Sequence, residues 1–128
     1  MLRRRKIAAE LRDRVARRDH FRCSYCQSPQ SVGVPMVLDH VIPLAAGGES
    51  TFDNLCLCCY RCNEFKGAKH QADDPRTRET TRLYNPCHEN WRDHFMWGKD
   101  GLMIVGKTAC GRATIHLLRL NDDRLVRA

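Results

Sequence analysis

The sequence predicts one small α+β domain whose core is stabilised by a cysteine-bound metal ion. Three observations lead to this prediction. The chain has 128 residues, which suits a single domain with a modest core. Segments typical of helices and of strands follow one another along it without internal repeats. Eight cysteines occur in a chain whose start has no signal-peptide pattern, so metal ligation is expected in preference to disulfides.

The first element expected is a basic helix over residues 6–19. Ile7, Leu11 and Val15 recur every four positions, which is typical of a helix that buries one face. Residues 1–22 contain nine basic and three acidic residues, so this segment carries +6 of the net charge of +7. The charge indicates a polyanionic partner, with nucleic acid as the default, and a solvated helix face is the alternative. The arginines and lysine expected to contact DNA here are Arg3, Arg4, Arg5, Lys6, Arg14, Arg17 and Arg18.

The middle of the chain predicts a strand, a loop, a second strand and a helix. The segment VPMVLDHVI, residues 34–42, is rich in β-branched side chains and is typical of a strand. The proline and glycines of residues 43–54 indicate a loop, and residues 55–58 are expected to form the returning strand. A helix then begins near Tyr60 and ends at Gly67, a residue that favours helix termination.

The remainder is expected to be a linker followed by a C-terminal extension that packs on the core. Residues 71–83 are polar and predict the linker between segments 1–70 and 84–128. The extension is expected to contain a β-hairpin plus a helix: strands at 94–97 and 102–106, a turn at 98–101 and a helix at 109–118. No apolar run approaches the length that crosses a bilayer, so a cytoplasmic chain without a membrane partner is expected.

Two C-x2-C pairs predict a structural zinc site. Cys23 and Cys26 form the first pair, and Cys59 and Cys62 form the second. Each pair can form a tight knuckle that presents two thiolates to one tetrahedral Zn²⁺. The 32 residues between the pairs would be closed into a loop that contains the strand–loop–strand unit.

The other cysteines leave one ambiguity in that assignment. Cys56 and Cys59 also have C-x2-C spacing, but Cys56 and Cys58 lie in the apolar strand pattern and are expected to be buried small hydrophobic residues. Cys87 and Cys110 have no partner at a suitable spacing and are expected to be packed or exposed thiols.

The end of the first strand and the start of the helix carry the candidate catalytic groups. Asp39 and His40 are adjacent, and adjacent strand residues point to opposite faces. They can serve one site only where the strand ends, which Pro43 and the residues before it favour. Asn63 directly follows a proposed zinc ligand, so its amide oxygen can be aimed at a hard divalent cation.

With these residues in place, the chain resembles the HNH endonucleases. The resemblance is carried by LDHVIPLAAGGESTFDNL and CYRCNEFKG, and it covers about residues 23–67. It implies a ββα-metal nuclease core, in which a β-hairpin and a helix surround one catalytic metal. It also implies hydrolysis of DNA phosphodiester bonds with Mg²⁺ or another divalent cation such as Mn²⁺.

The family pattern also implies a role for each matching residue. His40 matches the general base, and Asp39 matches the acid that binds the divalent cation. Asn54 matches the residue that orders the hairpin loop. Asn63 matches a second cation ligand, which is His or Asn in the family, so the chain resembles an H-N-N variant. Lys66 could touch a backbone phosphate, or it could be a solvated helix lysine.

Two other functions fit part of the sequence. A zinc-dependent nucleic-acid-binding module that does not cut would use the basic helix and the zinc site, but it would not need Asp39, His40, Asn54 and Asn63 together. A redox or zinc-handling protein would use the spare thiols. A monomer and a homodimer are both compatible with the sequence.

Overall fold

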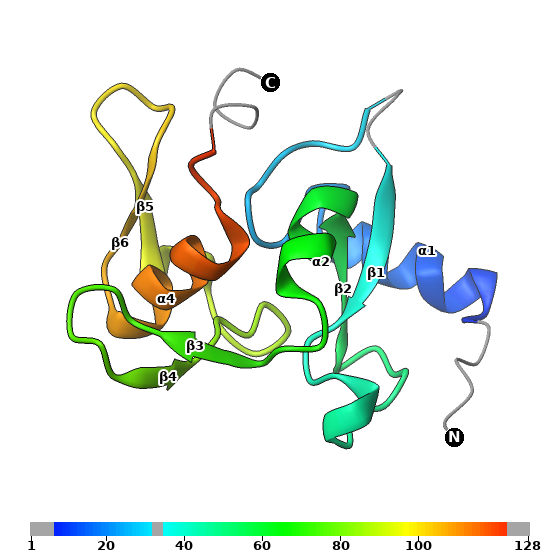
Figure 1. Ribbon diagram of the computed structural model, residues 1–128. Coiled ribbons are helices and arrows are strands. Elements are labelled where there is room, and N and C mark those ends of the chain that lie inside the picture. The colour runs from blue at the N-terminus through cyan, green and yellow to red at the C-terminus, as the bar shows by residue number, and fades with distance from the viewer. Residues whose placement is uncertain (1–6, 32–34, 123–128) are drawn as a thin grey trace.

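The computed structural model describes residues 7–31 and 35–122 (Figure 1). Four residues expected to contact DNA, Arg3, Arg4, Arg5 and Lys6, lie outside these ranges. The described chain contains short helices and three two-stranded antiparallel sheets, which confirms the predicted α+β class. The longest helices of the described ranges, α1 (Ala9–Arg18) and α4 (Ala109–Leu118), have 10 residues each, too few to cross a bilayer.

A β-hairpin followed directly by a helix forms the centre of the protein. Strand β1 (Met36–His40) pairs with β2 (Leu55–Cys59), and Asp39 lies opposite Cys56 in the register. Helix α2 (Tyr60–Lys66) begins at the residue after β2, and the thiol of Cys59 caps it by accepting a hydrogen bond from the amide of Cys62. Strand β1 ends at His40 and is shorter than the segment 34–42 predicted for it.

Helix α1 covers one side of this hairpin. Val15 is fully buried and packs with Leu38, Leu55 and Leu57 of the two strands. Ile7 and Leu11 pack against the same cluster. The apolar stripe predicted from their spacing is therefore the face by which α1 binds the sheet, although the helix is shorter than residues 6–19.

The predicted linker is wrong in its structure, because residues 71–83 contain a β-hairpin. Strand β3 (Gln71–Asp73) pairs with β4 (Thr80–Arg82). Between them, the carboxylate of Asp74 is buried and accepts two hydrogen bonds from Arg112 of α4, at 3.0 and 2.8 Å. This ion pair and the hairpin fasten the segment to α4, so it is a packed part of the fold.

The C-terminal extension forms a hairpin, the third of the described chain, and a helix, as expected. A helical turn, α3 (Trp91–His94), precedes β5 (Phe95–Trp97), which pairs with β6 (Ile104–Gly106). Strand β5 begins at Phe95, one residue after the predicted start at position 94, because His94 is the last residue of α3. Helix α4 occupies the predicted range, and Thr108 caps it by accepting a hydrogen bond from the amide of Gly111.

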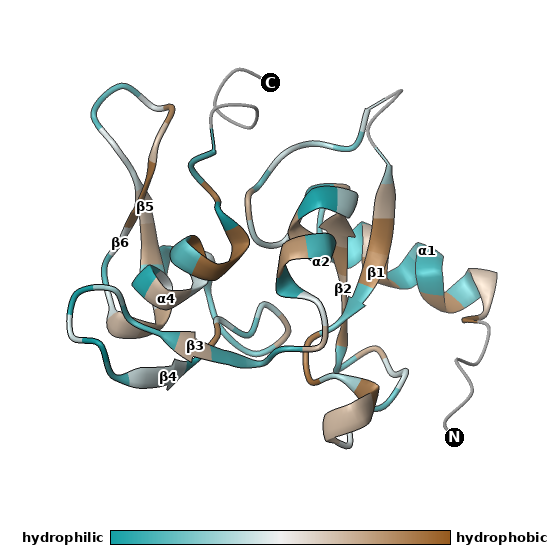
Figure 2. Cartoon of the chain, in the orientation of Figure 1, coloured by the Kyte–Doolittle hydropathy of each residue, from teal (hydrophilic) through white to brown (hydrophobic). Residues whose placement is uncertain are grey.

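The main core is shared between the centre of the protein and the extension. Tyr25 and the four cysteines of the C-x2-C pairs pack in one cluster with Tyr84, Phe95, Ile104 and Leu118. The ring of Trp91 stacks on Phe95 with 5.1 Å between centroids, so these aromatic residues form a core. Figure 2 shows hydrophobic residues along β1, β2 and β5, whereas β3 and the following turn are mainly hydrophilic.

Candidate active site and metal centre

The four cysteines of the two C-x2-C pairs converge on one point. The sulfur atoms of Cys23, Cys26, Cys59 and Cys62 all lie within 4.8 Å of one another, and the Cys26 and Cys59 sulfurs are 3.8 Å apart. Four sulfurs bound tetrahedrally to zinc at about 2.3 Å would lie roughly 3.8 Å apart. All four residues are buried. The donor set and its spacing therefore fit a structural Zn²⁺ ion.

The charge of these thiols depends on a cation. Burial raises the pKa of Cys23. Hydrogen bonds from the thiols of Cys23, Cys59 and Cys62 lower the pKa of Cys26. Four buried thiols this close cannot all ionise without a positive charge between them. A bound metal ion would supply that charge and hold the two knuckles together.

Cys56 and Cys58 do not belong to the four-sulfur cluster, although the thiol of Cys58 lies beside that of Cys23. The sulfur of Cys56 lies 3.9 Å from Oδ2 of Asp39, and that of Cys58 lies 3.3 Å from the carbonyl oxygen of Cys59. Both are fully buried, and burial raises the pKa of Cys58 to about 12. They are neutral, packed thiols, as expected from the strand pattern.

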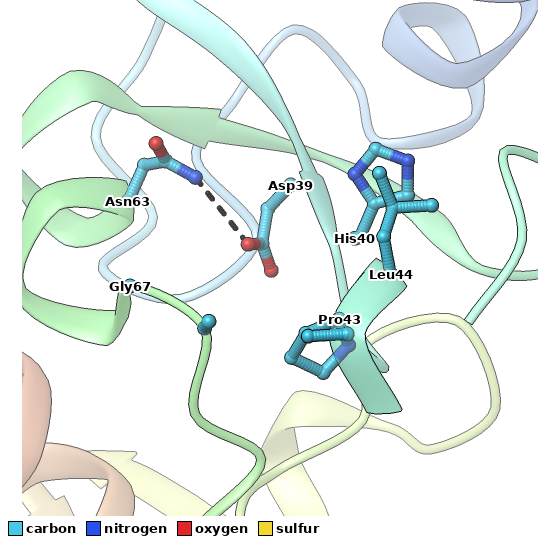
Figure 3. Close-up of a pocket in the computed structure, with 8 residues that line it drawn as sticks. Asp39, His40, Pro43, Leu44, Asn63 and Gly67 are labelled. Atoms are coloured by element: carbon cyan, nitrogen blue, oxygen red, sulfur yellow. Dashed lines mark hydrogen bonds between the residues drawn. The ribbon is translucent and has the colours of Figure 1, made fainter. Parts of the chain in front are cut away.

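A cavity of about 240 Å³ lies beside the end of β1 (Figure 3). Asp39 and His40 line it from the strand, and Asn63 lines it from α2. Both strand residues reach the cavity because β1 ends at His40, where the alternation of side chains no longer separates them. The rest of the lining is Pro43, Leu44, Ala45, Gly67 and Ala68.

The Asp39 carboxylate accepts hydrogen bonds from four side chains, one of which is the Cys56 thiol described above. The Asn63 amide nitrogen lies 3.3 Å from Oδ1, the contact drawn in Figure 3. The Lys66 ammonium lies 3.3 Å from Oδ1 and 3.1 Å from Oδ2. The Tyr25 hydroxyl donates to Oδ2 at 2.7 Å. Asp39 is only 3% exposed, so the position of its carboxylate is closely fixed.

His40 is also held in place. Its Nε2 lies 2.8 Å from the hydroxyl oxygen of Ser50, which belongs to the loop between the two strands. Its backbone carbonyl accepts a hydrogen bond from Lys66 at 3.0 Å. Sequence reasoning missed Ser50, because a serine in a loop has no pattern that marks its partner.

Asn54 ties the loop to the end of β1. Its side-chain oxygen accepts from the amide of Ile42 at 2.9 Å, and its nitrogen donates to the carbonyl groups of Ile42 and Glu49. Gly48 lies in the same place, where an added Cβ would come 1.7 Å from the Ile42 carbonyl oxygen. The loop can close around Asn54 only with glycine at this position.

Lys66 differs from both sequence interpretations. A phosphate contact and a solvated lysine each require an exposed side chain, but Lys66 is fully buried with its ammonium on Asp39 and the His40 carbonyl. Burial is possible because the aspartate supplies the opposite charge. Lys66 is therefore an internal component of the site in this structure.

The arginines of α1 divide into two groups. The Arg17 side chain is 70% exposed and pairs with Asp13. Arg14 is also exposed, and its guanidinium lies over the ring of Phe52. Arg18 is turned inward instead: its guanidinium donates to the carbonyl groups of Phe52 and Leu55 and pairs with Asp19. The expectation that Arg18 faces water or a phosphate is thus corrected.

The β-hairpin and the helix that follows it are consistent with the ββα fold of the HNH family. Residues 23–69 match the family model described as HNH endonuclease, so this segment is an HNH domain within a longer chain. The chain is also similar to the CRISPR-associated endonuclease Cas9 of Corynebacterium diphtheriae. The two are 39% identical over 51 residues, which cover 39% of this chain but 5% of that protein. None of the solved structures matches the chain significantly.

Proposed function

We propose that this chain is a metal-dependent HNH endonuclease that hydrolyses DNA phosphodiester bonds. In this proposal His40 is the general base, Asp39 and Asn63 hold a divalent cation, and Asn54 orders the loop that carries the site. The observation that supports it is the convergence of Asp39, His40 and Asn63 on one cavity. A protein that only binds nucleic acid has no need of this arrangement.

The donor set of the cavity fits a small hard cation. Neighbouring oxygen ligands at about 2.1 Å from a six-coordinate Mg²⁺ lie about 3.0 Å apart. The amide nitrogen of Asn63 and Oδ1 of Asp39 are 3.3 Å apart, close to that separation. To act as a ligand, the Asn63 amide must turn over so that its oxygen replaces the nitrogen beside Asp39.

The side chains of the cavity can perform the remaining chemistry. A neutral imidazole accepts a proton near neutral pH, so His40 can deprotonate the attacking water. The Ser50 hydroxyl orients the ring for that transfer. A bound Mg²⁺ or Mn²⁺ would supply positive charge to the phosphate and to the leaving oxygen.

The basic helix gives this domain a means of holding DNA. Arg14 and Arg17 are exposed on α1, which packs on the same hairpin that carries the site. Exposed arginines bind phosphates regardless of sequence and would hold the duplex against the domain. The name of the Cas9 relative, an endonuclease, supports the same reaction for residues 23–69.

Nicking of supercoiled plasmid with Mg²⁺ or Mn²⁺ tests the proposal. The wild-type protein should convert supercoiled DNA to the open-circular form, and chelation with EDTA should stop it. His40→Ala should slow the reaction about 10²- to 10⁴-fold. His70→Ala is the matched control, because His70 is exposed and lies outside the cavity.

Two outcomes would contradict this function. Equal nicking by wild type and His40→Ala would exclude His40 as the base. DNA binding without cleavage, for several metals and for supercoiled, single-stranded and branched DNA, would favour the non-catalytic zinc-dependent nucleic-acid-binding module.

A further inference from the structure

Tyr25 connects the four-cysteine cluster with the cavity. It lies between Cys23 and Cys26, and its hydroxyl reaches Oδ2 of Asp39 at 2.7 Å. The side chain is fully buried, and its hydroxyl donates a hydrogen bond to the carboxylate. This is the shortest hydrogen bond that the described residues make to Asp39.

The backbone of Tyr25 is held as firmly as its side chain. Its carbonyl oxygen accepts a hydrogen bond from the indole nitrogen of Trp91 at 3.0 Å, and its ring packs edge-on against Tyr84 at 6.4 Å. The knuckle fixes the residue on both sides through the adjacent cysteines. The direction of the Tyr25 hydroxyl is therefore set by the zinc knuckle and by the extension together.

We propose that Tyr25 is a positioning residue that couples the zinc knuckle to the divalent-cation site by holding Oδ2 of Asp39. With that oxygen occupied, Oδ1 stays on the side of Asn63, where the proposed function requires a ligand. This inference rests on the proposed function, since it assumes that Asp39 binds the cation. It assigns to the cysteine cluster a second role besides holding the fold together.

The geometry also predicts what loss of the hydroxyl does. Without it, only Lys66 and the Cys56 thiol hold Oδ2, so the carboxylate is positioned less firmly and binds a cation less well. Partners of metal ligands typically contribute about 10- to 100-fold in affinity. Tyr25→Phe keeps the ring in the core, so the fold and the zinc site should remain.

The experiment compares Mn²⁺ affinity in four proteins by isothermal titration calorimetry. Tyr25→Phe should bind Mn²⁺ about 10- to 100-fold more weakly than wild type, while zinc content and melting temperature stay close to wild type. Tyr84→Phe is the matched control, because it removes the hydroxyl of a neighbouring buried tyrosine that donates to the Glu89 carbonyl and not to Asp39. Asp39→Ala reports whether the cation binds at Asp39 at all.

The outcomes separate the two proposals. If Tyr25→Phe binds Mn²⁺ as tightly as wild type while Asp39→Ala does not bind it, the coupling is overturned and the cation site stands. If Asp39→Ala binds Mn²⁺ like wild type, the proposed cation site fails, and the role of Tyr25 fails with it. An equal loss of affinity in Tyr84→Phe would also overturn the specific role of Tyr25.

Discussion

The ammonium nitrogen of Lys66 lies 3.1 Å from Oδ2 of Asp39, and both side chains are removed from solvent. The ammonium also donates to the carbonyl group of His40, so one buried cation joins α2 to the last two residues of β1. Lys66 thus holds the helix that carries Asn63 against the strand that carries Asp39.

Lys66→Met should destabilise the protein. Removal of one partner leaves the Asp39 carboxylate buried without its countercharge, which typically costs about 3–5 kcal/mol. Thermal unfolding with and without Mn²⁺ provides the measurement, and Mn²⁺ should raise the melting temperature of Lys66→Met more than that of wild type. Lys69→Met, which changes an exposed lysine, is the control. A melting temperature of Lys66→Met equal to wild type would contradict the role of the ion pair.

Cys59→Ser should lose zinc and unfold, whereas Cys56→Ser should keep zinc. The Cys59 sulfur belongs to the four-sulfur cluster, and the Cys56 sulfur faces Asp39. Structural zinc sites contribute directly to the free energy of folding. Zinc content by mass spectrometry and unfolding by circular dichroism would test this. Equal zinc loss in both variants would mean that the ligand set is wrong.

Asp74 should contribute stability that disappears in acid. The hydrogen bonds from Arg112 hold the pKa of Asp74 well below its usual range, despite the opposing effect of burial. A carboxyl with a lowered folded pKa stabilises the protein above its unfolded pKa of about 3.9, and this stabilisation falls as the pH drops toward the folded value.

Melting temperatures of wild type and Asp74→Asn between pH 7 and pH 2.5 would measure this contribution. The difference between the two proteins should be largest near neutral pH and should shrink below about pH 4. The comparison cancels acid effects that both proteins share, such as protonation of the cysteines. A difference that does not change with pH would show that Asp74 carries no such linkage.

Arg17→Ala and Arg18→Ala should have opposite phenotypes. Arg17 makes an exposed ion pair of little energetic value, so its loss should leave stability within about 0.5 kcal/mol. It should reduce the slope of log affinity for DNA against log salt by about 0.9 if the side chain contacts one phosphate.

Arg18→Ala should instead lower the melting temperature, because it removes charged hydrogen bonds to two backbone carbonyl groups. Fluorescence anisotropy with labelled duplex at several salt concentrations measures the slope, and thermal unfolding measures the stability. An unchanged slope in Arg17→Ala would mean that this face of α1 does not touch DNA.

Elements with a clear apolar period were predictable from the sequence. Helix α4 has the predicted bounds, and the β1–β2 hairpin and α2 lie within about two residues of expectation at their described ends. The cysteine pairs were predictable because their spacing is a chemical requirement of the knuckle. The residues around Pro43 predicted that the strand ends near Asp39 and His40, but β1 stops at His40, two residues before the predicted end.

Features that depend on a distant partner were not predictable. Strands β3 and β4 are polar and short, and their stability comes from α4 and from the buried pair of Asp74 with Arg112. Lys66 looked like a surface lysine because its countercharge lies 27 positions earlier in the chain. Tyr25 was missed for the same reason, since nothing in its knuckle indicates an acceptor 14 positions away.

The shared core has a consequence for anyone who wishes to transplant this domain. The family match ends at residue 69, but Tyr25 and the cysteine cluster pack against Tyr84, Phe95 and Leu118, and Trp91 binds the Tyr25 carbonyl. A fragment that ends at residue 69 would expose to water the surface of Tyr25 and the cysteine cluster that the extension covers. Grafting onto another scaffold would therefore have to carry residues 84–120 along, or replace the surface they cover.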